Sequence, residues 1–122
     1  MSPTSRNLVH ELVIPCTAEF VATARIFIGG VAATVTDDAA LVDDLKLATS
    51  ELVTAVVESR SADTLRLVAT IEGSQLTVQL TPWSASFAID DFGALDIVDA
   101  LFPGTAVEDG SVLVPVPLGD HA

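Results

Sequence analysis

Residues 36–58 read TDDAALVDDLKLATSELVTAVVE and carry the strongest helix signal of the chain. Apolar side chains recur at i, i+4, i+7, i+11 and i+15 in this stretch, at Leu41, Leu45, Ala48, Leu52 and Val56. This spacing places one apolar stripe along a helix. Asp37 and Asp38 precede it, where side-chain oxygens cap free N–H groups and negative charge is favoured by the helix dipole. The sequence therefore predicts a helix over about 38–58.

The residues before this helix predict a strand and another helix. Residues 8–14 are mostly apolar or β-branched, and Pro15 ends the run because proline cannot donate to a continuing ladder. Residues 1–6 are polar, and we expect them to form a flexible tail. After Thr17, an expected N-cap, apolar residues recur at helical spacing at Phe20, Ala24, Phe27, Ile28 and Val31. This pattern predicts a helix over about 18–34.

A hairpin is predicted after the long helix. Residues 65–72 and 75–80 alternate between apolar and polar side chains, as half-buried strands do. The side chains expected on the buried face are Leu65, Leu67, Ala69, Ile71, Leu76, Val78 and Leu80. Gly73-Ser74 joins the two strands, and a dipeptide with glycine first suits a type II′ turn. Residues 82–91 are expected to form a loop.

A short helix and a second hairpin complete the chain. The apolar positions Leu95, Val98 and Leu101 have helical spacing. This helix is expected to stop before Pro103-Gly104. Two final strands are predicted near 105–108 and 111–116, and Asp109-Gly110 between them is typical of a type I′ turn.

These elements predict one domain over residues 1–122 with the order β-α-α-β-β-α-β-β. Half of the residues are hydrophobic, which is enough to form a core and excludes disorder as a description of the whole chain. The layered arrangement that this order of elements allows has helices packed on one face of a mostly antiparallel sheet. The expected fold class is an α/β (α+β) two-layer sandwich.

The charge of the chain excludes several classes of partner. Five lysines and arginines face 17 aspartates and glutamates, giving a formal charge of -12, and no cation follows Arg66. DNA and RNA would repel such a surface, and so would an anionic membrane. We therefore expect no nucleic acid and no membrane as partners, and favour a basic protein surface or an apolar groove.

The cysteine and histidine content indicates a compartment and excludes a metal site. Cys16 is the only cysteine and there are two histidines, too few for a disulfide or a structural zinc site. The paired aspartates, among them Asp43-Asp44 and Asp90-Asp91, lack the spacing of a calcium loop, so no metal site is expected. We find no signal peptide and no membrane span, and expect a cytoplasmic protein.

Two charged residues stand out within apolar helices. Glu51 lies among aliphatic residues late in the long helix, where it is either a solvated surface acid or a general base. Arg25 is the only charge between Glu19 and Asp37, and its side chain either extends along the helix to solvent or serves a binding surface. Gly29-Gly30 lies inside a helix, which indicates close packing against a neighbour.

The run DDLKLATSELVT at 43–54 resembles the N-box helix of the anti-sigma factor serine kinases, whose pattern is close to DDLRLAVSELVTNA. That family belongs to the histidine-kinase-like (GHKL, or Bergerat) ATPase superfamily. Ala24-Arg25 matches an Ala-Arg of the family, and the resemblance covers nearly the whole chain. It implies a Bergerat-type fold, Glu51 as the base that activates a serine hydroxyl of an anti-anti-sigma partner, and Arg25 on the partner-binding face.

The same resemblance marks three departures around the family's nucleotide site. Ala55 replaces an asparagine that helps to hold magnesium, and a methyl group offers no ligand oxygen. Thr81-Pro82-Trp83 begins the segment where the family has Asp-x-Gly-x-Gly. Phe92 and Ala94 replace the two glycines of a phosphate-binding Gly-x-Gly-Leu box, where the backbone must approach closely. We therefore expect a degenerate site, filled by Pro82, Trp83, Phe87 and Phe92.

The resemblance and its departures lead to one expected function and two alternatives. The expected function is that of a regulatory pseudokinase that binds no cofactor. It would bind a sigma factor or an anti-anti-sigma-like protein in a partner switch that regulates transcription, and a homodimer is compatible with this role. The first alternative is an active serine/threonine protein kinase that uses Mg-ATP with Glu51 as base. The second is a small-molecule-binding module lined by Trp83 and Phe87.

Overall fold

The computed structural model describes residues 7–84 and 93–119. Three α-helices and five strands follow one another in these residues, with a short 3-10 helix in addition. Their bounds are β1 (Asn7–Pro15), η1 (Ala18–Phe20), α1 (Val21–Ala33), α2 (Ala39–Ser59), β2 (Thr64–Glu72), β3 (Gln75–Thr81), α3 (Ala94–Leu101), β4 (Ala106–Glu108) and β5 (Ser111–Pro117). The expected tail at 1–6, residues 85–91 of the expected loop, which include Phe87, and the following Phe92 lie outside the described residues.

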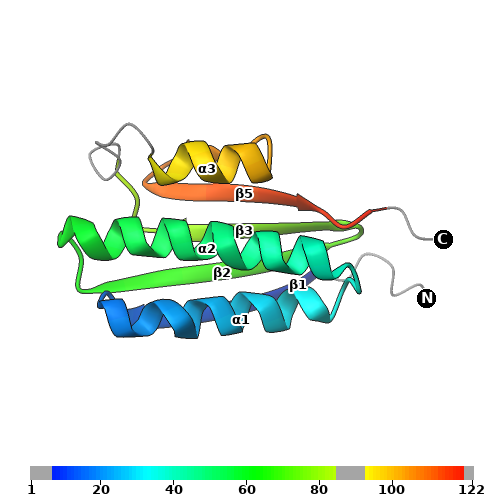
Figure 1. Ribbon diagram of the computed structural model, residues 1–122, viewed down its shortest axis with the longest axis horizontal. Helices are drawn as coiled ribbons and strands as arrows, with labels where there is room; N and C mark the ends of the chain where they lie inside the picture. Colours follow the sequence, from blue (N-terminus) through cyan, green and yellow to red (C-terminus); the bar gives the residue numbers. More distant parts are fainter. Residues whose placement is uncertain (1–6, 85–92, 120–122) are drawn as a thin grey trace.

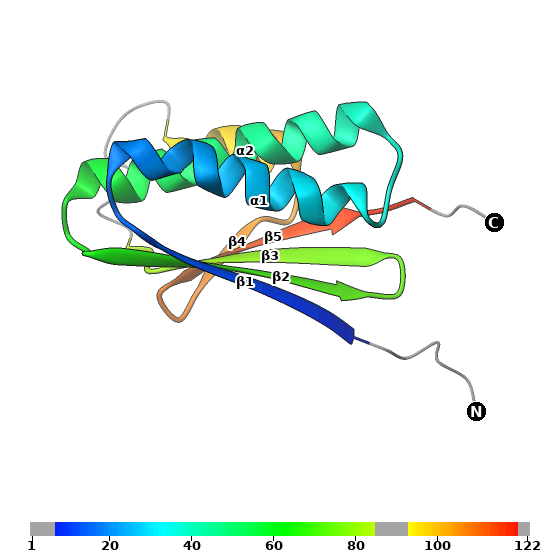
Figure 2. The same cartoon turned by 90° about the horizontal axis from the view of Figure 1, so that it is seen from below.

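The five strands form one sheet in the order β1-β2-β3-β5-β4, and every pairing is antiparallel. The three α-helices lie together on one face of this sheet, and its other face is open (Figure 2). In the view of Figure 1, α2 runs between α1 on one side and α3 on the other. The two-layer α/β arrangement expected from the sequence is confirmed, with a sheet that is antiparallel throughout.

The core lies between the helices and the sheet. All seven predicted core positions of β2 and β3 are buried, and their neighbours alternate with them toward the open face. Four of the five predicted stripe positions of α2 are buried, and Leu41 is half-buried at the first turn. None of the helices in the described ranges is both long and apolar enough to cross a bilayer.

Both hairpin turns and the N-cap of α2 are formed as the sequence predicted. Gly73 has a φ of 63° and Ser74 is not among the residues with positive φ, as a type II′ turn requires. Asp109 and Gly110 have φ values of 51° and 78°, as a type I′ turn requires. At the start of α2 the Asp38 carboxylate accepts a hydrogen bond of 3.2 Å from the backbone N–H of Leu41.

The start of the first helix differs from its prediction. Instead of one α-helix over 18–34, residues 18–20 form a 3-10 turn and α1 begins at Val21. Thr17 is at the N-cap of this turn, but its side chain makes no capping hydrogen bond there. Its backbone carbonyl accepts instead from the N–H of Phe20, at 3.0 Å, which closes the tighter turn.

Candidate functional site

Glu51 lies near the middle of α2, half-buried beside the buried Leu52 and Val53. Within residues 7–84 and 93–119 its carboxylate has no hydrogen bond and no ion pair. The preceding Ser50 turns its hydroxyl back into the helix and donates to the carbonyl of Lys46 at 2.9 Å. The Ser50 hydroxyl is therefore used within the helix, whereas the Glu51 carboxylate remains available to a ligand or partner.

The two flanks of α2 face different helices. On one flank the Lys46 side chain lies against Gly29 of α1, whose missing Cβ would stand 3.1 Å from the Lys46 Cδ. Ala55 is nine residues after Lys46, which places it about 180° around the helix, and Glu51 is on the same side as Ala55. This is the side on which α3 lies (Figure 1). Glu51 and Ala55 thus share the α3 flank of α2.

The α3 flank is poor in groups that could hold a nucleotide. Ala55 is half-buried and packs against the core. Ala94, the first residue of α3, is buried, and the N-cap residue Gly93 has no side chain to offer. Methyl groups supply neither oxygen ligands for magnesium nor donors for phosphate. Phe92, the other residue of this predicted box, lies outside the described residues.

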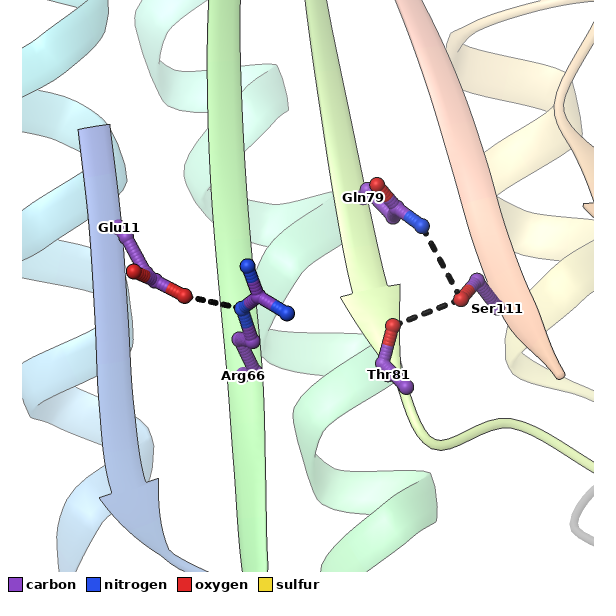
Figure 3. Close-up of polar contacts among 5 residues, drawn as sticks. All are labelled: Glu11, Arg66, Gln79, Thr81 and Ser111. Atoms are coloured by element: carbon purple, nitrogen blue, oxygen red, sulfur yellow. Dashed lines mark hydrogen bonds and ion pairs between the residues drawn. The ribbon is translucent and has the colours of Figure 1, made fainter. Parts of the chain in front are cut away.

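Thr81 is not brought to the same side of the sheet as Glu51. Its hydroxyl lies 2.7 Å from that of Ser111, and the Ser111 hydroxyl also accepts from the Gln79 amide at 3.2 Å. These three residues lie on the open face of the sheet, and the helices lie behind it (Figure 3). At this end of β3 the side chain that faces the helices is Leu80, which is fully buried.

Pro82 and Trp83 continue from the end of β3 into the core. Pro82 is half-buried, and only 4% of Trp83 is exposed. The Trp83 backbone N–H donates to the carbonyl of Gly110 at 2.7 Å, which ties this segment to the turn between β4 and β5. Trp83 is therefore a core residue in the described part of the chain.

Arg25 is exposed on α1, and α1 lies on the side of α2 opposite to α3 (Figure 1). Within the described residues it forms no ion pair, so it is not held by Glu19 or by a carboxylate of α2. The neighbouring Ile26 is 74% exposed, more than any other large hydrophobic side chain of the described ranges. Ala22 and Gly30, one turn away on either side, are also exposed and leave Ile26 protruding.

The remaining polar contacts do not create a metal centre. In the part of the chain that the structure describes, no three histidine, cysteine or acidic side chains are grouped to hold an ion. Glu11 of β1 and Arg66 of β2 form an ion pair on the open face of the sheet (Figure 3). Both side chains are well exposed, so this pair adds little to stability.

The sequence matches none of the protein-family models with which it was compared, and no curated protein is significantly similar to it.

Two features were not predicted: the exposure of Ile26 and the position of Thr81 on the open face of the sheet. Ile26 falls outside the apolar spacing of α1, whose buried positions are Ala24, Ile28, Val31 and Ala32. An apolar residue that is out of phase with its helix is the signal that could have identified it. The position of Thr81 on the open face follows from the alternation of β3, since it has the same parity as Thr77 and Gln79.

Proposed function

We propose that this protein is a regulatory domain that binds another protein through α1, and that it is a degenerate member of the anti-sigma serine kinase group with a Bergerat-type fold. The observation that carries the proposal is the exposure of Arg25 beside Ile26. An arginine that forms no ion pair with the described residues and lies next to a protruding apolar side chain is the composition typical of interface hot spots.

The surroundings of Glu51 support a role without catalysis. A phosphoryl-transfer site needs ligands for magnesium and donors for the phosphates around its base. Of the positions where the family has such groups, 55 and 94 are alanines here, and Gly93 offers only its backbone. We therefore infer that Glu51 retains the position of a general base, while the described positions 55 and 94 lack the groups that would hold a nucleotide beside it.

The partner that fits the resemblance is a sigma factor or an anti-anti-sigma-like protein in the cytoplasm. Arg25 would pair with a carboxylate of the partner, and Ile26 would enter an apolar pocket beside that carboxylate. No observation favours the small-molecule alternative, because Trp83 is packed in the core. The kinase alternative retains Glu51 and is separated from the proposal by its requirement for Mg-ATP.

The experiment is a binding titration against the sigma factors and anti-anti-sigma proteins encoded by the source organism. We expect one of them to bind the wild-type chain, and Arg25→Ala or Ile26→Ala to weaken that complex at least tenfold. Leu47→Ala is the matched control, because Leu47 is exposed on α2, outside the proposed surface. Absence of binding to every candidate, or equal affinity of all variants, would overturn the proposal.

A calorimetric titration with Mg-ATP tests the other half of the proposal. We expect no heat of binding at millimolar nucleotide, and no change in melting temperature, because a ligand that binds the native state must stabilise it. Transfer of phosphate from ATP to the captured partner, abolished by Glu51→Gln, would establish the kinase alternative instead.

A further inference from the structure

β4 forms one edge of the sheet, and its outer side is unpaired. Within the described residues its only strand partner is β5. The two-residue turn at 109–110 makes Glu108 and Ser111 a pair that exchanges both backbone hydrogen bonds. Backbone direction alternates along a strand, so the N–H and C=O groups of the preceding Val107 point away from β5. These two groups are in position to pair with a further strand.

The side chain of Val107 extends the apolar surface of the core to this edge. Val107 lies opposite Val112, which is fully buried, so the Val107 side chain is on the helix side of the sheet. It is nevertheless 47% exposed, and no strand of the described ranges lies beyond β4. Unpaired backbone groups beside an exposed apolar side chain are the features to which an extended segment of another protein adds a strand.

Carboxylates lie on both sides of this edge. On the helix side, the Asp99 carboxylate of α3 accepts a hydrogen bond of 3.3 Å from the N–H of Gly104, close to the start of β4. Asp96 precedes Asp99 by one turn of the same helix. On the open side is Glu108, because it lies opposite Ser111, whose hydroxyl contacts the open-face cluster. The three acidic side chains are exposed, and none forms an ion pair in the part of the chain that the structure describes.

The distribution of charge argues for a basic occupant. No lysine or arginine follows Arg66 in the sequence, whereas acidic residues continue to Asp120. A partner that supplies lysines or arginines therefore complements the charge of this edge. An extended segment directs its side chains alternately to the two sides of a sheet, so its cations would meet carboxylates on either side. The opposite edge suits such a segment less, because Glu11, the only charged residue of β1, pairs with Arg66.

We propose that the β4 edge and the neighbouring aspartates of α3 form a docking site for a basic, extended segment of a protein partner, which joins the sheet antiparallel to β4. An apolar residue of the segment packs on Val107 and exchanges two backbone hydrogen bonds with it, and the flanking cations face the carboxylates. α3 lies across α2 from α1 (Figure 1), so this site is separate from the surface of Arg25 and Ile26 and does not depend on what binds there.

A fluorescence anisotropy titration of the full chain with a labelled peptide of sequence KKVKK, acetylated and amidated, tests the docking. We expect binding that weakens as salt is added, because opposite charges attract the peptide. N-methylation of the peptide's valine should weaken binding at least tenfold, because it removes the donor to the Val107 carbonyl and places a methyl group against β4 without a change of charge. Equal affinity of the two peptides, or no binding at millimolar peptide, would overturn the proposal.

Charge-reversed variants locate the site. Asp96→Lys combined with Glu108→Lys should weaken the binding of KKVKK at least tenfold. Asp37→Lys combined with Glu72→Lys is the matched control, because it changes the net charge equally at two exposed acids outside the proposed site, and it should weaken binding less than threefold. The peptide should also slow hydrogen exchange of the Val107 amide, which gains an acceptor in the complex. Equal weakening by the two double substitutions, or an unchanged exchange rate at Val107, would contradict docking at β4.

Discussion

The side chain of Lys46 on α2 lies directly over Gly29 of α1, with its Cγ and Cδ 3.3 and 3.1 Å from the position that a Cβ of Gly29 would occupy. The following residue, Gly30, has nothing within 4 Å of that position. Gly29 therefore serves the packing of α1 on α2, as its occurrence inside a helix indicated, whereas Gly30 does not. Two adjacent glycines of the same helix thus differ in what an added methyl group would meet.

Gly30→Ala should stabilise the protein by about 1 kcal/mol, because alanine loses less backbone entropy than glycine in a helix and meets no neighbour here. Gly29→Ala should gain less, since the Lys46 side chain must move aside by a few tenths of an ångström. Urea unfolding of the two variants beside the wild type measures the difference. A larger gain for Gly29→Ala than for Gly30→Ala would contradict the contact with Lys46.

Ser111→Ala should destabilise the protein by about 1–2 kcal/mol, because a buried hydroxyl that is shared by two partners is lost. Ser111 is only 4% exposed, and its removal leaves the Gln79 amide and the Thr81 hydroxyl without this contact. Ser74→Ala, in the exposed turn between β2 and β3, is the control and should change stability much less. Equal effects of the two substitutions would show that the open-face cluster contributes nothing.

Glu51→Gln should change the free energy of unfolding by less than about 0.5 kcal/mol, because in the described residues no hydrogen bond or ion pair depends on its charge. Binding of the protein partner should also be unaffected, since Glu51 and Arg25 lie on different sides of α2. Thermal unfolding and the binding titration provide the two measurements. A loss of several kcal/mol would mean that this carboxylate has a structural partner.

Burial raises the pKa of the Cys16 thiol above its ordinary value of 9.0, and the nearby Asp63 carboxylate raises it further. The native state therefore keeps this proton when the unfolded chain has lost it. The contribution to stability is complete below pH 9 and is lost as the pH rises from the unfolded pKa toward the raised native pKa.

The same shift predicts slow alkylation of native Cys16. At pH 8 iodoacetamide should modify the native chain more slowly than the chain unfolded in guanidinium, because the thiolate is the reactive form. Cys16 is the only cysteine, so the modified mass reports a single site. Asp63→Asn should recover part of the rate and leave the effect of burial. Identical rates in the native and unfolded states would contradict the raised pKa.

The features that the sequence predicted well depend on neighbouring residues. The cap at Asp38 and the hairpin turns at 73–74 and 109–110 are determined by the chemistry of two to four consecutive residues, and the structure has them as expected. The apolar spacing of α2 is likewise local. What could not be predicted depends on residues far apart in the sequence, such as the exposure of the β1 edge and the side of α2 on which α3 packs.

In the candidate site, too, local features were predicted and features that depend on distant residues were not. The helical spacing already implied that Glu51 and Ala55 share a flank of α2. Thr81 is separated from that flank because its position in β3 has the parity of the open face, which the match to the family motif does not take into account. The exposure of Ile26 required knowing which face of α1 is covered, and this is decided by contacts with distant elements.

The antiparallel pairing of β1 with β2 has a consequence for the order of folding. β2 and β3 are joined by a two-residue turn, so their pairing closes a short loop. Because α1 and α2 lie between β1 and β2 along the chain, the pairing of β1 with β2 closes a much longer loop. Loop closure over such a separation costs more entropy and slows the step that requires it. The sheet should therefore grow outward from its central hairpin, and β1 should join late, detach first and exchange its amide hydrogens fastest among the long strands.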